Sequence, residues 1–446
     1  MKRLLAALPL CLCLTLLFAL QVGAQTEPDP AIVAEINRLK AIDNHAHPLR
    51  FVAEGEKDDE EYDALTFEEM EPSQPPVRLR SDNPEYIAAW RELYGYKYAD
   101  MTEGHVRELL EAKRRAMREH GAGYPAWVLD KLGIETMFAN RVAMGQGLIR
   151  PRFRWVAFDD ALLFPLNTDA ARKANADYRS FYTGEERLLK RYLAQSNFEA
   201  PPLTFEQYLK TVVTPTLERQ KREGAVAIKF EAAYLRSLDF ADAPEGEARR
   251  VYEKYVRNGE PQAAEYKSLQ DYLFRYMARE AGRLGLAVHI HCLTGAGSYY
   301  SLRGANPLLL EQVFNDPSLR KTNFVLIHGG WPYVREVAFL FSKPNVYADF
   351  SGQTFLLYPR ELSQTLRIWL EHYPEKVLFG TDSAPFAPEV NWEETGWLTT
   401  TTARRALALA LTGMVNDGEI TRERAIELAR MVMRENAIRL YNLKAQ

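Results

Sequence analysis

The chain has 446 residues, with 56 Lys and Arg against 60 Asp and Glu, which gives a net charge of −4 with neutral histidines. This near balance gives no electrostatic reason to expect nucleic acid or an anionic membrane as a partner. The length fits a single α/β barrel with insertions and provides a large buried core. We therefore expect a small-molecule substrate as the partner, and a homo-oligomer stays open.

The N-terminus has the pattern of a secretory signal peptide. A basic start precedes an apolar run from Leu4 to Leu20, and small residues follow up to Ala24. Excluding residues 1–24 leaves one predicted domain at 25–446 and an exported protein, periplasmic or secreted. No later run is long and apolar enough to cross a membrane. Cys292 is the one cysteine left after cleavage, so no internal disulfide is expected.

Short apolar runs alternate with helical patterns along most of the chain. Strands that alternate with helices are typical of parallel βαβ units, and eight such units predict a distorted (β/α)8 TIM barrel. The predicted strands are 42–47, 134–142, 152–158, 225–230, 286–292, 323–328, 345–350 and 376–380. Helical patterns that would complete the outer layer are 31–40, 399–415 and 421–441.

Three insertions interrupt this alternation. The first is helical, spans about 50–125, begins acidic and contains a loop signal at Ser73-Gln74-Pro75-Pro76. The others, at 160–200 and 231–268, follow the third and fourth predicted strands. Connections that follow a barrel strand lie on its C-terminal face, so we expect these insertions to surround the site.

Two patterns in the first insertion can be interpreted. Tyr86, Trp90 and Tyr94 recur every four residues on one helix face. Such an aromatic stripe favours packing on the barrel, and the alternative is a lid that contacts substrate. The Lys113-Arg114-Arg115 run is predicted to be a solvated helix face.

A His-x-His pair stands at the end of the first predicted strand. Side chains alternate along a strand, so His45 and His47 project from the same face and both can reach one metal ion. Pro48 cannot continue a central strand, which places the pair at the C-terminal lip, where such barrels keep their active sites. The pair alone is weak evidence for a metal site.

Further ionisable side chains end other predicted strands: Lys229, His289, His291, His328 and Asp382. A polar group that points into a barrel is costly unless it is paired or bound to metal, so several at one end favour a site. Imidazoles with a carboxylate suit Zn²⁺ or a similar divalent ion, with one coordination position left for water.

The order His-x-His, Lys, His, His, Asp on successive strands resembles the amidohydrolase superfamily. More narrowly, it is similar to the amidohydrolase-related subgroup that includes the N-terminal domain of fungal and plant glutamine-synthetase-like fusion proteins. The segments that carry the resemblance are Asp43–His47, Phe138–Val142, Arg152–Val156, Lys229 with Ala232–Tyr234, His328–Tyr333, Asn345–Phe350 and Phe379–Asp382. The resemblance covers nearly all of the mature chain and leaves the 50–125 insertion unmatched.

The resemblance implies that His45, His47, His291 and Asp382 are metal ligands. It also implies that His328 either binds a second metal ion or, in single-metal members, orients water and polarises the substrate. A divalent cation lowers the pKa of bound water towards ~7. Asp382 would take the proton from that water and return it to the leaving group.

Four other candidates have more than one interpretation. In two-metal relatives a lysine on the fourth strand is carboxylated and bridges the ions, whereas an ordinary Lys229 ammonium would pair with a carboxylate. His289 lies deeper in the barrel, so support of the site or contact with substrate is expected rather than ligation. Arg152 and Arg154 would bind a substrate carboxylate, although pairing with acidic neighbours is the commoner outcome. Asp43 is predicted to be a buried, hydrogen-bonded carboxylate.

Together these features predict an exported, metal-dependent hydrolase that attacks a C–N or other polarised bond. One alternative is a decarboxylase on the same barrel, which a single metal ion and Arg152 or Arg154 near the pocket would favour. The other is a non-catalytic metal or ligand receptor, for which an open coordination position and a proton acceptor are more than binding needs.

Overall fold

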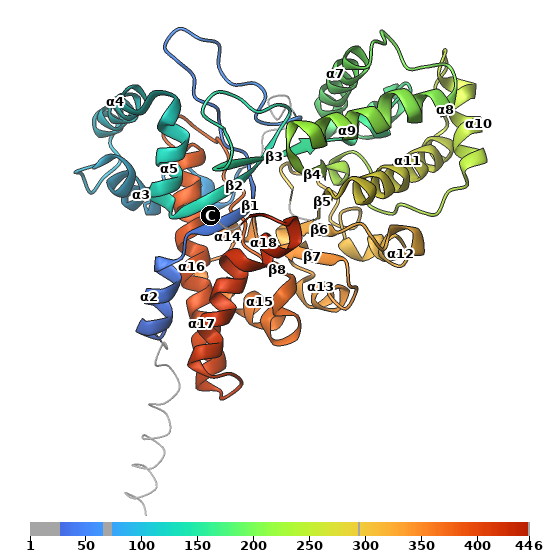
Figure 1. Ribbon diagram of the computed structural model, residues 1–446. Helices are drawn as coiled ribbons and strands as arrows, with labels where there is room; N and C mark the ends of the chain where they lie inside the picture. The colour runs from blue at the N-terminus through green and yellow to red at the C-terminus, as the bar shows by residue number, and fades with distance from the viewer. Residues whose placement is uncertain (1–26, 66–73, 293–294, 445–446) are drawn as a thin grey trace, which may run out of the picture.

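The computed structural model describes residues 27–65, 74–292 and 295–444 (Figure 1). The predicted signal peptide at 1–24 and Ser73 of the loop signal lie outside these ranges. Among the described residues, no helix is long and apolar enough to cross a membrane.

Eight parallel strands form the centre of the molecule, and each pairs with the next in chain order. They are β1 (Ala41–Ala46), β2 (Ile134–Arg141), β3 (Phe153–Phe158), β4 (Ala225–Phe230), β5 (Ala287–His291), β6 (Phe324–Ile327), β7 (Val346–Asp349) and β8 (Val377–Leu378). Beyond the last pair, Asn44 N donates to Phe379 O at 2.9 Å, so the end of β8 meets β1. The predicted (β/α)8 barrel and its strand positions are confirmed.

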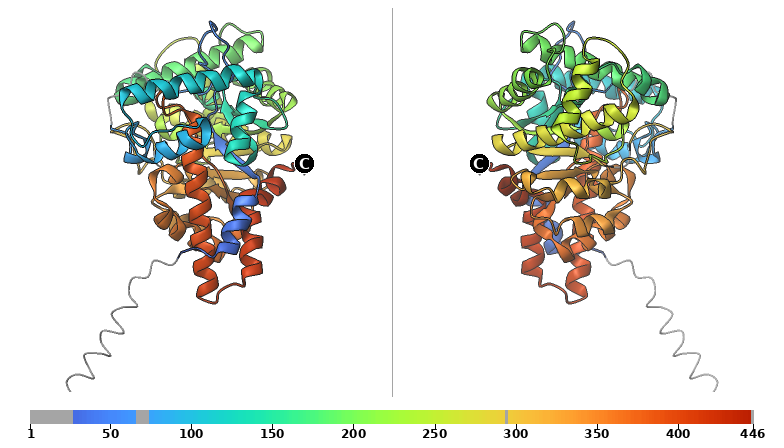
Figure 2. Two further views of the ribbon diagram at one scale, coloured as in Figure 1. Left: turned by 90° about the vertical axis from the view of Figure 1, so that its left-hand side faces the viewer. Right: turned by 90° about the vertical axis from the view of Figure 1, so that its right-hand side faces the viewer.

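Helices surround the strands on the outside (Figure 1). Those that cover the barrel are α2 (Pro30–Arg38), α9 (Thr214–Glu223), α11 (Ala263–Leu284), α12 (Glu311–Phe314), α13 (Val334–Leu340), α14 (Gln353–Leu356), α15 (Pro359–His372), α16 (Trp392–Asn416), α17 (Arg422–Arg430) and α18 (Asn436–Tyr441). The helices of the insertions are α3 (Glu85–Tyr94), α4 (Glu103–His120), α5 (Tyr124–Leu132), α6 (Asp169–Ala174), α7 (Arg179–Gln195), α8 (Phe205–Gln207) and α10 (Glu245–Tyr255). The loop between α16 and α17 lies at the opposite end of the molecule from α4 and α7 (Figure 2).

Apolar side chains fill the barrel. Ile42, Phe138 and Val156 belong to an interior cluster whose members are almost fully buried, and Tyr441 of α18 packs against it. The Phe138 and Tyr441 rings meet edge to face, with centroids 4.6 Å apart. A packed interior of this kind leaves the strand ends, rather than the barrel centre, as the place for a site.

The first insertion packs on the barrel through α3, which lies against α16. Tyr86 and Trp90 are fully buried, so the predicted packing of this aromatic face is confirmed. The predicted solvated face is wrong for Lys113, which is buried and places its Nζ 2.8 Å from both carboxylate oxygens of Glu394 in α16. Arg114 and Arg115 beside it are exposed. Lys113 was misread because its partner lies 281 residues further along the chain.

Candidate active site

A cavity of about 690 Å³ opens at the C-terminal ends of the strands. Five of the predicted site residues line it together: His45, His47, His291, His328 and Asp382. They come from the ends of β1, β5 and β6 and from the turn after β8. The cavity has the size of a small-molecule site.

Three imidazoles surround the Asp382 carboxylate. His45 Nε2 lies 3.1 Å from Asp382 Oδ1, and His47 Nε2 lies 3.7 Å from the same oxygen. His328 Nδ1 lies 3.7 Å from Asp382 Oδ2. On its other side, His328 Nε2 lies 3.1 Å from His291 Nδ1. The side chains that the sequence places on separate strands therefore converge on one point.

His45 has the character of a metal ligand. Its side chain is 1% exposed, and neither ring nitrogen makes a hydrogen bond with a described residue. Nε2 is close to Asp382 without being aligned to donate to it, which is the arrangement of two ligands around a shared cation. Burial, and then the charge of Lys229, lower the pKa of His45 well below its ordinary value. The ring is thus neutral, as metal binding requires.

The site residues that follow β6 and β8 have strained backbones. His328 and Asp382 have φ angles of 66° and 59°, which non-glycine residues rarely adopt. Asp382 N donates to His45 O at 2.7 Å, and His328 N donates to Asp349 Oδ1 at 3.0 Å, so local hydrogen bonds hold these conformations. Strain of this kind is concentrated at functional sites.

Asp43 ties β1 to the turn that carries Asp382. Its carboxylate accepts hydrogen bonds from Thr381 N at 2.9 Å and from Thr381 Oγ1 at 2.6 Å. The prediction of a buried, hydrogen-bonded carboxylate is confirmed for Asp43, which is fully buried. Burial raises its pKa to about 7.

His289 lies behind the site and does not line the cavity. Its Nε2 is hydrogen-bonded to Tyr441 Oη at 2.6 Å, and that hydroxyl donates to Asn44 Oδ1 at 2.5 Å. Asn44 Nδ2 in turn donates to Asp349, the carboxylate that holds His328. Of the two predicted roles, this geometry fits support of the site and not contact with substrate.

Lys229 is fully buried on β4, in register with His289 on β5. Its Nζ lies 3.3 Å from Glu231 Oε1. It does not line the cavity. This contact fits the ion-pair interpretation, and carboxylation of Lys229 stays a prediction.

Arg152 and Arg154, beside and at the start of β3, do not line the cavity. Arg152 precedes β3, at the opposite end of the barrel, and its Nη2 lies 2.9 Å from Asp130. Arg154 is the second residue of that strand, and burial lowers its pKa. The predicted contact of these arginines with substrate does not fit their positions. A residue at the start of a parallel strand lies away from the C-terminal face, where the cavity opens.

Sequence reasoning missed two carboxylates that line the same cavity, Asp63 and Glu231. His47 Nδ1 lies 3.0 Å from Asp63 Oδ2, and ligand atoms of His47, Asp63 and Glu231 lie within 4.8 Å of one another. Burial opposes protonation of His47, but the Asp63 carboxylate raises its pKa above the ordinary value. Glu231 could have been found, because it follows Lys229 by two residues. Asp63 lies in a segment without regular secondary structure, where no periodicity marks it.

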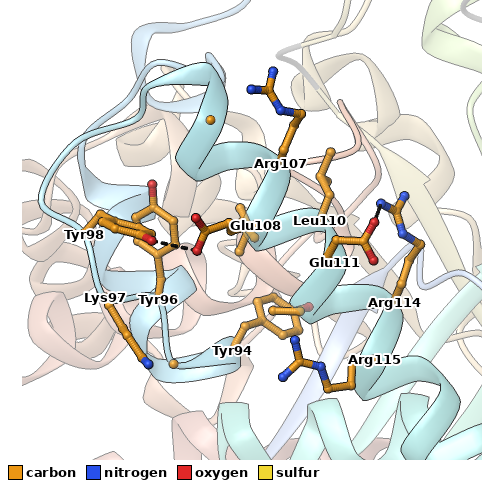
Figure 3. Close-up of a pocket in the computed structure, with 14 residues that line it drawn as sticks. Tyr94, Tyr96, Lys97, Tyr98, Arg107, Glu108, Leu110, Glu111, Arg114 and Arg115 are labelled. Atoms are coloured by element: carbon orange, nitrogen blue, oxygen red, sulfur yellow. Dashed lines mark hydrogen bonds and ion pairs between the residues drawn. The ribbon is translucent and has the colours of Figure 1, made fainter.

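A second cavity, of about 540 Å³, lies between α3 and α4 on the first insertion (Figure 3). Several of its polar side chains already have partners: Tyr98 Oη donates to Glu108 at 2.6 Å, and Arg114 lies 2.5 Å from Glu111. The residues that line it include no histidine. We therefore place the candidate active site at the barrel mouth.

A family model described as Amidohydrolase matches residues 217–443, slightly more than half of the chain. The chain belongs to this family. It is an amidohydrolase-related enzyme, and the resemblance inferred from its motifs is confirmed. Members of this family depend on a divalent metal ion, and the neutral, unpartnered His45 beside Asp382 fits one.

Among curated proteins, the amidohydrolase is similar to Protein fluG of Emericella nidulans, with 29% identity over 236 residues. The match covers 50% of this chain and 26% of that protein, so the chain spans about a quarter of its relative's length.

Solved structures share the fold. A Lactobacillus casei protein assigned as a metal-dependent hydrolase has a TM-score of 0.63 at 15% identity, covering 93% of this chain and 98% of that one. Glucuronate isomerase from Caulobacter crescentus has a TM-score of 0.60 at 14% identity, covering 93% and 94%. Uronate isomerase from Thermotoga maritima has a TM-score of 0.57 at 13% identity, covering 94% and 100%. Identities this low establish a common fold and leave the reaction open.

Proposed function

We propose that this amidohydrolase hydrolyses a C–N or related polarised bond of a small molecule, with His45, His47, His291 and Asp382 holding a divalent metal ion. The observation that carries the proposal is the pair formed by His45 and Asp382. A buried, neutral imidazole without a hydrogen bond lies 3.1 Å from a carboxylate that reaches the cavity. Imidazole and carboxylate donors suit Zn²⁺, which we propose as the ion.

Asp382 is the proton carrier in this proposal. A bound divalent cation acts as a Lewis acid and lowers the pKa of water. The Asp382 side chain is 17% exposed, more than the imidazoles around it, so water in the cavity can reach it. Asp382 accepts a proton as the water oxygen bonds to the substrate carbon, and returns it to the nitrogen as the C–N bond breaks.

His328 is placed to orient the reacting groups. Ser351 Oγ lies 3.0 Å from its Nδ1 and fixes the ring, while Asp349 holds its backbone. Burial lowers the pKa of His328 well below its ordinary value, so the ring is neutral. A neutral ring next to Asp382 polarises the substrate without competing for the proton that Asp382 carries.

The cavity lining favours hydrolysis over decarboxylation. A substrate carboxylate that is not bound by the metal ion needs another cationic partner, and the lining residues that the structure describes include neither Lys nor Arg. They include instead two carboxylates besides Asp382, namely Asp63 and Glu231.

The test is a substrate screen on the metal-loaded protein with amides, dipeptides and lactones, run beside small carboxylic acids with CO₂ detection. We expect hydrolysis that a chelator abolishes and that added Zn²⁺ restores. Release of CO₂ without hydrolysis would replace the hydrolase by a lyase. Hydrolysis that survives complete metal removal would refute the proposed metal dependence.

A further inference from the structure

Asp63 and Glu231 form an acidic wall of the cavity, and the ring of His47 separates this wall from Asp382. The His47 ring lies between the two, with Nε2 facing Asp382 at 3.7 Å and Nδ1 facing Asp63 at 3.0 Å. Glu231 completes the wall, and its side chain is 6% exposed. Two carboxylates this close and this buried repel each other unless positive charge lies near both.

One atom of this wall has no partner within the described chain. Lys229 lies near Glu231 Oε1, whereas Glu231 Oε2 is buried and makes no hydrogen bond with any described residue. Glu231 lines the cavity, so a bound molecule would contact the side chain that carries this oxygen. A buried carboxylate oxygen without a donor calls for a donor from a ligand.

The surroundings hold a third buried acidic side chain. Behind the wall, Glu185 is 1% exposed, and both of its carboxylate oxygens lack hydrogen-bond partners among the described residues. α7 packs closely against the backbone next to Asp63, because a Cβ on Gly184 would lie 2.6 Å from Ala64 O. The acidic wall is therefore a built feature of the fold.

Aromatic rings complete the lining beside these carboxylates. Tyr62, Tyr234, Phe355 and Phe386 all line the cavity. The faces of aromatic rings attract cations, and they do so more strongly where water is excluded. Carboxylates and aromatic rings in one cavity therefore favour an organic cation over an anion.

We propose that the substrate carries a protonated amine or guanidinium group, which binds to Asp63 and Glu231 while its polarised bond lies at Asp382. The proposal rests on the proposed function and narrows its substrate class. Because a single imidazole separates the two positions, only a short linker joins the cationic group to the bond that is cleaved. The group donates to Glu231 Oε2, the atom that lacks a partner.

The experiment compares two ligands of equal shape, n-butylguanidinium and n-butylurea, by calorimetric titration at pH 7. With the metal-loaded protein, we expect the guanidinium to bind at least about tenfold more tightly than the neutral urea. Glu231→Gln should remove this preference. Glu185→Gln is the matched control, because it makes the same substitution at a buried glutamate of the same region that does not line the cavity, and it should leave the preference in place.

The same titration on metal-stripped protein separates this proposal from the proposed function. Asp63 and Glu231 remain there, so the preference for guanidinium should persist even if the metal or the reaction is misassigned. Equal binding of the two ligands, or a preference unchanged by Glu231→Gln, would overturn the proposal. A second equivalent of metal that is lost in Glu231→Gln would also overturn it, because a metal ion would then hold that position.

Discussion

Buried charged and polar groups have partners in one region of this molecule and lack them in another. Around the first insertion, two buried cations are fully paired: Lys113 Nζ bonds both oxygens of Glu394 in α16, and Arg141 of β2 bonds both oxygens of Asp59 at 2.8 and 2.9 Å. At the barrel mouth, His45 and Glu231 have buried polar atoms without partners. Folding alone favours paired groups, so unpartnered polar atoms on residues that line a cavity point to a ligand there.

The ion pair between Arg141 and Asp59 also supports the cavity at the barrel mouth. Arg141 Nη1 donates to Pro48 O at 2.7 Å as well as to Asp59. These bonds anchor the segment that leaves β1 and leads to Asp63. The acidic wall of the cavity therefore depends on a structural ion pair that touches no ligand.

The largest effect should come from Asp382→Asn. An amide cannot accept the proton, so turnover should fall by about 10²–10⁴-fold, the usual contribution of general acid–base catalysis. The measurement is kcat on whichever substrate the screen identifies, with circular dichroism to confirm the fold. Wild-type turnover in this variant would exclude the proposed proton transfer.

Lys113→Ala should destabilise the fold by removing the ion pair with Glu394, and it should leave the candidate active site unchanged. It leaves Glu394 buried beside Glu393 without its cation, which should lower the free energy of unfolding by about 3–5 kcal/mol. Urea denaturation measures this loss. Arg114→Ala is the control, since that neighbour is exposed and should change stability by less than about 0.5 kcal/mol. Equal losses in the two variants would contradict the assignment of Lys113 as a buried structural charge.

Asp63→Asn tests whether the first insertion takes part in the site. Without the carboxylate 3.0 Å from Nδ1, the His47 ring loses the partner that orients it. Replacing such a partner typically lowers metal affinity by about 10–100-fold. Competition with a chelator of known affinity measures this change. Unaltered affinity would mean that Asp63 does not position His47.

Asp159→Asn should change the pH dependence of stability. Burial raises the pKa of Asp159 from 3.8 to about 7, although Gln220 opposes this by donating a hydrogen bond. The folded protein thus holds this proton more tightly than the unfolded chain, so its stabilising contribution is complete below pH 3.8 and is lost as the pH rises towards 7. Wild type should lose roughly 1.4 kcal/mol per pH unit relative to Asp159→Asn inside that window. Parallel stability curves for the two proteins would contradict this.

Most of the barrel could be predicted from the sequence because its signals are local. Each strand is a short apolar run, and His45, His328 and Asp382 stand directly at strand ends, where alternation and the barrel rule place them together. The motif order then identified the family.

Residues that act across long sequence distances could not be predicted. Lys113 pairs with Glu394 and Asp63 reaches His47 from an irregular segment, so neither position carries a periodic signal. Arg152 and Arg154 were misplaced for a related reason. Their charge suggested binding, whereas their place at the start of β3 sets them at the other end of the barrel.

Metal content per chain tests the central claim most directly. Elemental analysis of protein purified without chelator should find at least one equivalent of a divalent metal in the wild type. The double variant His45→Ala/His47→Ala should contain almost none while keeping its fold. Stoichiometric metal in the folded double variant, or a wild type that binds no Zn²⁺ when it is supplied, would contradict the assignment of His45 and His47 as ligands of a metal ion.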